Sequence, residues 1–109
     1  MNEQETKEFT VRIIREECAT RGIEIKKIIL FGSHARGDAN PDSDWDFLLV
    51  TENELSHKEK MEIRLYSARK LAREDISADL IIKDETTFNR QLENVGVITY
   101  YAVREGVSV

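Results

Sequence analysis

The spacing of apolar residues changes along the first half of the chain, and each change predicts a new element. Over residues 3–21, apolar side chains fall about four positions apart among charged residues, which is typical of a helix, and Gly22 is a suitable end. Residues 25–31 instead form a compact run of β-branched and aromatic side chains, and residues 45–50 form a second apolar run. Both runs are too short for typical helices and predict buried strands, joined by a loop over residues 32–43.

The second half of the chain predicts helices around one more strand. Ser56, with Glu59 three residues later, is the signature of a capped helix that we expect to end near Asp75. The apolar repeat that indicates this helix has spacings of +4, +3 and +4 and consists of Met61, Leu65, Ala68 and Ala72. Residues 79–83 predict a third strand, and residues 86–94 predict a short helix.

A last helical face, through Val95, Ile98 and Ala102 up to Gly106, completes the order α-β-β-α-β-α(α). The second and third strands are joined by a helix, so we expect them to be neighbours and parallel. The first and second strands are joined by a loop that reverses direction, so we expect them to be antiparallel. The fold class is therefore α/β (α+β), with a small mixed sheet of about three strands packed with helices. A length of 109 residues predicts a single domain over 1–109.

Composition narrows the classes of function. Sixteen Lys and Arg against 21 Asp and Glu leave a formal charge of −5, which argues against direct, sequence-independent binding of nucleic acid. No apolar run approaches the ~20 residues that span a membrane, and the polar N-terminus lacks the apolar centre of a signal peptide. The one cysteine, Cys18, excludes an internal disulfide and fits a reducing compartment. We expect a cytoplasmic protein without membrane binding.

The predicted topology brings five residues of the chain to one edge of the sheet. Gly32 and Ser33 follow the first strand, and Asp44 and Asp46 enter the second, so the loop between them starts and ends at the same edge. Asp44 and Asp46 are two apart on an extended segment, which points both side chains to one face. Asp79 opens the third strand and arrives at that edge if the second and third strands are parallel.

Three converging carboxylates predict a cation site. They repel one another, so without a cation at least one of them has a raised pKa. A hard divalent ion relieves the repulsion, and oxygen ligands suit Mg²⁺, with Mn²⁺ as the alternative. Because Mg²⁺ takes few protein carboxylates and completes its shell with water and phosphate, three aspartates suit two metal ions and a nucleoside triphosphate.

The beginning of the loop offers a phosphate site. Gly32 allows the backbone close to a ligand, and Ser33 can donate its hydroxyl and amide. The Ser33–Arg36 stretch can form a helical turn whose N-terminus faces an anion. Arg36 either contacts phosphate oxygens or faces solvent. His34 receives no catalytic role, because a lone loop histidine is usually a surface residue.

An ordinary acidic turn is the competing interpretation. Asn40, Pro41, Asp42 and Ser43 are common turn residues, and a lone Asp-x-Asp at the start of a strand is more often a turn or a cap than a metal site. The conjunction of Gly-Ser after one strand, Asp-x-Asp entering the next and a third aspartate on the following strand favours the site. Asp42 itself we interpret as a turn former.

These residues resemble a known family. Gly32-Ser33, ten intervening residues and then Asp44-Trp45-Asp46 match the G-S-x10-D-x-D signature of polymerase-β-like nucleotidyltransferases. The fuller string resembles the minimal nucleotidyltransferases (MNT proteins) of prokaryotes, over nearly the whole chain. The resemblance implies that Gly32 and Ser33 hold the triphosphate of an NTP such as ATP. It also implies that Asp44, Asp46 and Asp79 bind two Mg²⁺ ions, and that Asp79 helps to activate the acceptor hydroxyl.

The acceptor of the nucleotide is less defined than the donor. The chain has no room for the added domains by which larger relatives hold RNA, DNA or an aminoglycoside, so we expect another protein or a second copy to present the acceptor. MNT proteins are typically paired with a HEPN-family ribonuclease toxin and can transfer AMP to one of its tyrosines, which is the leading hypothesis here. An interface could come from Val95, Ile98, Tyr100, Tyr101 and Val103, although packing on the sheet is the commoner role of such residues.

Two other functions remain open on the sequence alone. The chain could nucleotidylate a small molecule such as an antibiotic, with a dimer partner completing the acceptor pocket. It could instead block a toxin by contact, without catalysis. A homodimer and a hetero-oligomer are both compatible with these alternatives.

Overall fold

The computed structural model describes residues 1–109 and contains the predicted helices and strands together with one further strand. In chain order the elements are α1 (Glu3–Ala19), β1 (Ile25–Phe31), α2 (Ser33–Arg36), β2 (Trp45–Thr51), α3 (His57–Ala72), β3 (Ala78–Asp84), α4 (Glu85–Gln91), α5 (Ile98–Glu105) and β4 (Val107–Ser108). The helical turn considered for residues 33–36 is present as α2, whereas β4 was not predicted.

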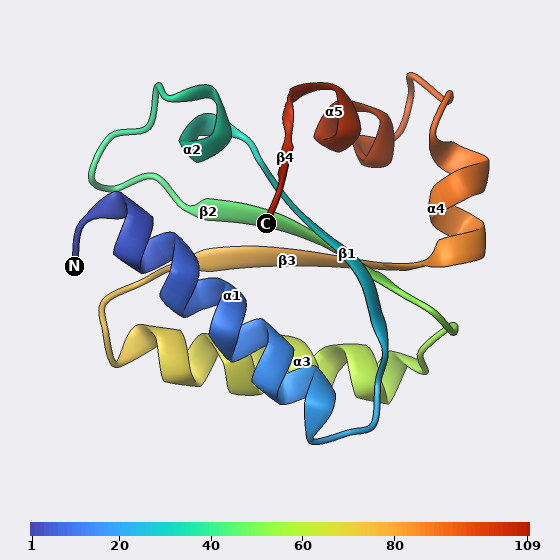
Figure 1. The fold of residues 1–109 in the computed structure, drawn as a ribbon, viewed down its shortest axis with the longest axis horizontal. Helices are drawn as coiled ribbons and strands as arrows, with labels where there is room; N and C mark the ends of the chain where they lie inside the picture. The colour runs from blue at the N-terminus through green and yellow to red at the C-terminus, as the bar shows by residue number, and fades with distance from the viewer.

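The strands form one mixed sheet in the order β3-β2-β1-β4 (Figure 1). As predicted, β1 and β2 are antiparallel, and β2 and β3 are parallel. The unpredicted β4 is antiparallel to β1 and makes the second edge of the sheet. The end of β1 and the starts of β2 and β3 therefore lie at one edge, as the candidate site requires.

The sheet separates two hydrophobic cores. Helices α1 and α3 cover one face, where Ile14, Ile28, Phe47 and Ile63 belong to a cluster of 10 buried residues. Helices α4 and α5 cover the other face, where a smaller cluster of 6 includes Phe88 and Ala102. Side chains alternate between these faces along β2, so the strand is apolar on both sides. No helix is both long enough and apolar enough to cross a membrane.

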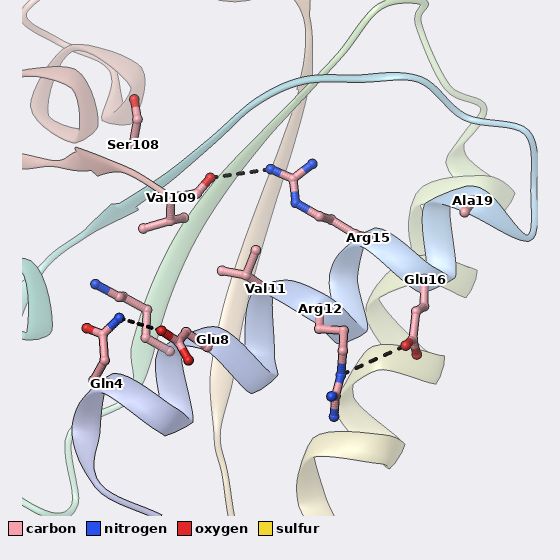
Figure 2. Close-up of a pocket in the computed structure, with 10 residues that line it drawn as sticks. Gln4, Glu8, Val11, Arg12, Arg15, Glu16, Ala19, Ser108 and Val109 are labelled. Carbon is pink, nitrogen blue, oxygen red and sulfur yellow. Dashed lines mark hydrogen bonds and ion pairs between the residues drawn. The ribbon is translucent and has the colours of Figure 1, made fainter.

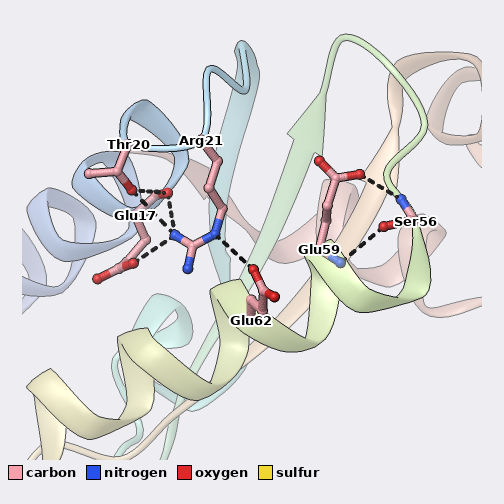
Figure 3. A network of polar contacts seen from close by, with 6 residues as sticks. All are labelled: Glu17, Thr20, Arg21, Ser56, Glu59 and Glu62. Carbon is pink, nitrogen blue, oxygen red and sulfur yellow. Dashed lines mark hydrogen bonds and ion pairs between the residues drawn. The ribbon is translucent and has the colours of Figure 1, made fainter.

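A polar network joins α1 to α3 (Figure 3). Glu17, whose side chain is only 7% exposed, contacts Lys70 Nζ at 2.6 Å and Arg21 at 2.8 Å. Arg21 also approaches Glu62 at 3.6 Å. Burial acts to raise the pKa of Glu17, but the hydrogen bonds from Lys70 and Arg21 outweigh it and hold the pKa below its usual value. This carboxylate is therefore neutralised by the chain itself.

The capped helix α3 begins as predicted, but it does not bury the apolar repeat that predicted it. Ser56 and Glu59 form the expected capping box. The buried positions are Ile63, Ser67 and Leu71. Met61 and Leu65 of the repeat that predicted the helix are 54% and 49% exposed. Two polar contacts help to fix which side of α3 faces the core. Glu62 faces Arg21, and Arg64 Nε donates to the carbonyl of Leu80 at 2.9 Å.

The C-terminal region differs from the sequence-based expectation in two further ways. The fourth helix ends at Gln91 rather than residue 94. Packing on the sheet was the commoner role for the five apolar residues between 95 and 103, but four are exposed: Val95, Ile98, Tyr101 and Val103. Gly106 ends α5 as expected, because a Cβ there would meet Ile29, the Leu30 carbonyl and the Ala102 carbonyl.

A hollow of about 610 Å³ lies between α1 and the C-terminal residues (Figure 2). Half of its 10 lining residues are charged, and Arg15 donates across it to the carbonyl of Val109 at 3.4 Å. It contains none of the residues predicted for the candidate site.

Candidate active site

The structure brings together the carboxylates that the sequence places at one edge of the sheet. Asp46 of β2 lies in register with Asp79 of the parallel strand β3, and on its other side pairs with Phe31 at the end of β1. Asp44 immediately precedes β2. Asp46 is partly buried, whereas Asp44 and Asp79 are exposed. The half-buried carboxylate is thus flanked by two that reach solvent.

Burial and neighbouring negative charges both disfavour the ionised form of Asp46. Burial raises the pKa of Asp46, and the charges of Asp79 and Asp44 raise it further. His34 and Arg36 oppose this shift through their charges without reversing it. The direction of this shift agrees with the expectation that, without a cation, at least one of the converging carboxylates has a raised pKa.

The carboxylates do not form a complete metal centre on their own, since no group of three or more His, Cys, Asp or Glu side chains is arranged to hold an ion. The donor set nevertheless suits a hard divalent cation, because it consists of carboxylate oxygens with unrelieved repulsion. Mg²⁺ needs only one or two carboxylates when substrate phosphate and water supply the remaining ligands. Asp46 and Asp79, paired across neighbouring strands, are the residues best placed to hold such an ion.

Gly32 brings the loop close to Asp46. Its φ of 77° lies where side chains are rarely tolerated, and a Cβ at this position would collide with Asp46 Oδ2. The amides of Ala35 and Arg36 donate to the Gly32 carbonyl at 3.1 and 3.0 Å, which forms the α2 turn directly after the glycine. Gly37, with a φ of 85°, ends the turn. Glycine at position 32 therefore lets the backbone and the carboxylate share the edge of the sheet.

His34 has a structural role that the sequence did not reveal. The expectation of a surface histidine was wrong: its side chain is 6% exposed and stacks on Trp45, with ring centroids 3.8 Å apart and planes 7° from parallel. One ring nitrogen lies 3.0 Å from the Ser43 carbonyl and the other 2.8 Å from a Glu3 carboxylate oxygen. His34 thus joins the start of the loop to its end. Trp45 between two aspartates is the only sequence feature that could have suggested a stacking partner.

Arg36 is occupied by carboxylates of the chain. Its guanidinium contacts Asp38 at 3.2 Å and Glu105 at 3.2 Å, and these hydrogen bonds raise the pKa of Arg36. Of the two alternatives for this residue, phosphate contact would require it to leave both partners. Asp42 behaves as a turn residue, because its amide donates to the Asn40 side chain at 2.9 Å.

A hollow of about 470 Å³ runs around the exposed edge of β3 and includes both Asp46 and Asp79 in its lining. Nine of its 13 lining residues are hydrophobic, among them Phe31, Ile81 and Ile98. Its volume is in the range of small-molecule sites, and its few polar groups include these two carboxylates. This hollow can accept a ligand together with a cation. A reacting group of that ligand would then lie beside Asp79.

Comparison with known proteins shows which proteins the chain is similar to. The family model described as "Nucleotidyltransferase domain" matches residues 11–103, which include all the predicted site residues. Two proteins of Methanocaldococcus jannaschii, MJ0141 and MJ0604, both provisionally named protein adenylyltransferases, are similar in sequence. The first is 36% identical over 77 residues, covering 68% of this chain and 78% of its own length. The second is 32% identical over 92 residues, covering 84% of each.

Solved structures show the same fold at lower identity. A chain of a toxin–antitoxin complex with AMP-PNP has a TM-score of 0.61 at 20% identity, over 99% of this chain and 72% of that one. A complex of a tri-AMPylated Shewanella oneidensis HEPN toxin with its MNT antitoxin gives 0.59 at 18%, over 98% and 71%. A provisionally assigned nucleotidyltransferase of Sulfolobus solfataricus gives 0.57 at 22%, over 99% and 86%.

Proposed function

Because the chain belongs to the nucleotidyltransferase domain family, we propose that it transfers AMP from ATP to a hydroxyl group of a partner protein. The observation that carries this proposal is the position of Asp46, which lies in register with Asp79 and so close to Gly32 that no side chain fits at position 32. Burial and the charges of Asp79 and Asp44 raise the pKa of Asp46. The provisional names of the two similar proteins support protein as the acceptor.

In this proposal Asp44, Asp46 and Asp79 hold two Mg²⁺ ions, which when bound supply positive charge to the triphosphate. Gly32 and Ser33 lie against the phosphates at the start of α2, and Arg36 reaches the phosphates after leaving Asp38 and Glu105. Asp79, exposed on the edge strand, orients the acceptor hydroxyl. The acceptor oxygen forms a bond to the α-phosphorus, the bond from that phosphorus to the β-phosphate bridging oxygen breaks, and pyrophosphate leaves. The hydroxyl proton passes to the Asp79 carboxylate and then to water.

For the partner we propose a HEPN-family toxin, with a tyrosine as the acceptor. The fold similarity to chains of toxin–antitoxin complexes, one containing an AMPylated HEPN toxin, supports this choice. The chain would then act in the cytoplasm as an antitoxin within a hetero-oligomer. A neighbouring gene for a helical protein with an Arg-x4-6-His motif would favour the toxin pair over a small-molecule acceptor.

Mass measurement of the partner tests the proposal. Incubation of the candidate toxin with this protein, ATP and Mg²⁺ should add the mass of one or more AMP groups, located on tyrosine by fragmentation. Asp44→Asn and Asp46→Asn should abolish the gain, because each removes a charge needed to hold the cations. Asp42→Asn is the matched control, since Asp42 lies in the same loop but takes part in its hydrogen bond to Asn40 only through its backbone amide.

The outcomes separate the competing functions. No mass gain, together with full neutralisation of the toxin by Asp46→Asn, would replace catalysis with blocking by contact. A mass gain on an aminoglycoside but not on the toxin would move the acceptor to small molecules. Equal transfer by Asp46→Asn and the unchanged chain would remove Asp46 from the site.

A further inference from the structure

The outward side of α3 carries an apolar stripe that is exposed to solvent. We define the outer stripe as Met61, Leu65, Ala68 and Ala72, all of which are exposed. The opposite side of the helix, through Ile63, Ser67 and Leu71, already faces the core. A surface helix normally turns polar residues outward, so the outer stripe is a second apolar face.

The spacing of the outer stripe is that of a helix-packing seam. Alternating steps of +4 and +3 are the heptad pattern, which places two apolar positions in every seven residues and by which two helices keep their apolar seams in contact over successive turns. A seam of this kind fits another helix better than it fits a flat surface. Met61 and Leu65 supply the large side chains, and the alanines allow close approach of a second backbone.

Cations flank the outer stripe on both sides. Arg64 lies one turn from Met61 and Ala68, on the side facing β3, and Arg69 lies one turn from Leu65 and Ala72, on the other. Neither takes part in any of the chain's nine ion pairs. The acidic residues of α3 are used elsewhere, since Glu59 closes the cap and Glu62 faces Arg21. A basic rim on a chain of net charge −5 is therefore a local feature of this face.

We propose that the outer stripe docks an amphipathic helix of a partner protein, with an apolar seam and acidic residues on either side of it. Charge complementarity selects this occupant. A second copy of α3 would bring Arg64 and Arg69 against their own equivalents in either orientation, which costs affinity through like-charge contact. An anionic membrane surface would meet only two large apolar side chains and no aromatic anchor within the stripe.

This docking surface borders the hollow of the candidate active site, because Ala68 and Arg64 line that hollow together with Asp46 and Asp79. Phe47 points into the core beneath α1 and α3, and Asp46, one residue earlier on β2, therefore points to the other face of the sheet. The proposal does not rest on nucleotide transfer, because the peptide-binding test below measures docking and not catalysis.

A synthetic helix tests the proposal with a defined probe. We suggest a three-heptad peptide with Leu at the seam and Glu at both flanking positions, and a matched peptide with Lys at those positions. Calorimetric titration should detect binding of the Glu peptide only, weakened steeply by salt. Amide chemical-shift changes in the protein should centre on α3.

Two variants and one control distinguish the stripe from other exposed apolar residues. Leu65→Glu should weaken binding of the Glu peptide on the order of tenfold or more, because it places a charge in the seam. Val103→Glu, the same change at an exposed position of α5, should leave it unaltered. The double charge reversal Arg64→Glu and Arg69→Glu should reverse the preference, so that the Lys peptide binds. Circular dichroism and Tm of each variant verify folding.

Other results would overturn the proposal. Equal affinity for the two peptides, or binding unaffected by Leu65→Glu, would contradict an acidic helix in the stripe. A dimer detected by sedimentation and lost in Leu65→Glu would make a second copy the occupant. Binding to phosphatidylglycerol vesicles without binding to the Glu peptide would make a membrane surface the occupant of the outer stripe.

Discussion

Glu17 and Asp46 are both acidic residues withdrawn from solvent, and their surroundings are opposite. Glu17, between α1 and α3, has Lys70 and Arg21 within 2.8 Å and a pKa held below its usual value. Asp46, at the edge of the sheet, has a raised pKa, which is due first to burial and then to the charges of Asp79 and Asp44. Where a buried carboxylate supports the fold, the chain provides the cations. At the candidate site, no ion pair of the chain neutralises Asp46, and we propose that a ligand supplies this charge.

The same contrast appears in how each region is held. The α1–α3 region relies on ion pairs and on a capping box at the start of each helix. The site relies on a glycine with positive φ in contact with a carboxylate, and on a stacked His34. Sites that bind charged substrates commonly keep such unfavourable arrangements, at a cost in stability that ligand binding then offsets.

Removing the charge of Glu17 should have the largest effect on stability. Glu17→Gln should lower the free energy of unfolding by about 1.5 to 3 kcal/mol, because it leaves Lys70 without a charged acceptor and Arg21 with Glu62 alone. Since the pKa of Glu17 is lowered on folding, the loss should be full at neutral pH. It should shrink as the pH falls below about 4.3, where the unfolded chain's carboxylates take up protons. Urea unfolding of both proteins between pH 3 and pH 7 measures this difference in the free energy of unfolding.

Glu16→Gln is the control for this prediction. Glu16 faces Arg12 at 3.9 Å on the exposed side of the same helix, so its loss should cost less than about 0.5 kcal/mol. Equal effects of the two changes would show that Glu17 is not held more strongly than a surface residue.

Adding a side chain at Gly32 should be nearly as damaging. Gly32→Ala forces a Cβ into Asp46 and a strained backbone on any side chain, with an expected loss of about 1 to 3 kcal/mol. Gly37→Ala has a similar positive φ but open space around its Cβ, so it reports backbone strain alone. The difference between the two Tm values isolates the contact with Asp46, and no difference would contradict it.

Removing the His34 side chain should loosen the loop. His34→Ala loses the stacking on Trp45, for which we expect a cost of about 0.5 to 1.5 kcal/mol. His34→Phe retains a ring and should recover part of the stability without the hydrogen bonds to Ser43 and Glu3. If His34 positions the two halves of the site, both variants should raise the KM for ATP. A stability loss with an unchanged KM would limit His34 to the fold.

The smallest effect should have the opposite sign. Asp46→Asn removes a carboxylate whose pKa is raised on folding, so it should stabilise the ligand-free protein by about 0.5 kcal/mol. The neutral acid is favoured in the folded state, so the gain is absent below about pH 4. It develops as the pH rises through the folded pKa. Thermal melts across pH 4 to 8 test this, and a lower Tm for the variant at neutral pH would contradict the account of Asp46.

Local pattern and connectivity explain what the sequence could predict. The lengths of the apolar runs identified β1, β2 and β3, and the helix between β2 and β3 required them to be parallel, which placed Asp79 beside Asp46. Gly32 and the α2 turn followed from residue type and position. These features depend on neighbours in sequence or on topology rules, which one sequence carries.

Features that depend on distant side chains could not be predicted. Met61 and Leu65 are the most apolar residues of their repeat, yet contacts of α3 with Arg21 and Leu80 turn them outward. The two-residue strand β4 has no periodicity to recognise, and it exists because Gly106 ends α5 against β1. The burial of His34 depends on Trp45, eleven positions away, closing over it.

Thermal stabilisation by nucleotide and Mg²⁺ tests most directly the claim that a bound cation neutralises Asp46. The Tm of each protein is compared with and without AMP-PNP and Mg²⁺, so that differences in ligand-free stability cancel. We predict a rise for the unchanged chain and for Asp42→Asn, a smaller rise for Asp79→Asn and none for Asp46→Asn. An equal rise for Asp46→Asn, or no rise for the unchanged chain, would contradict the claim.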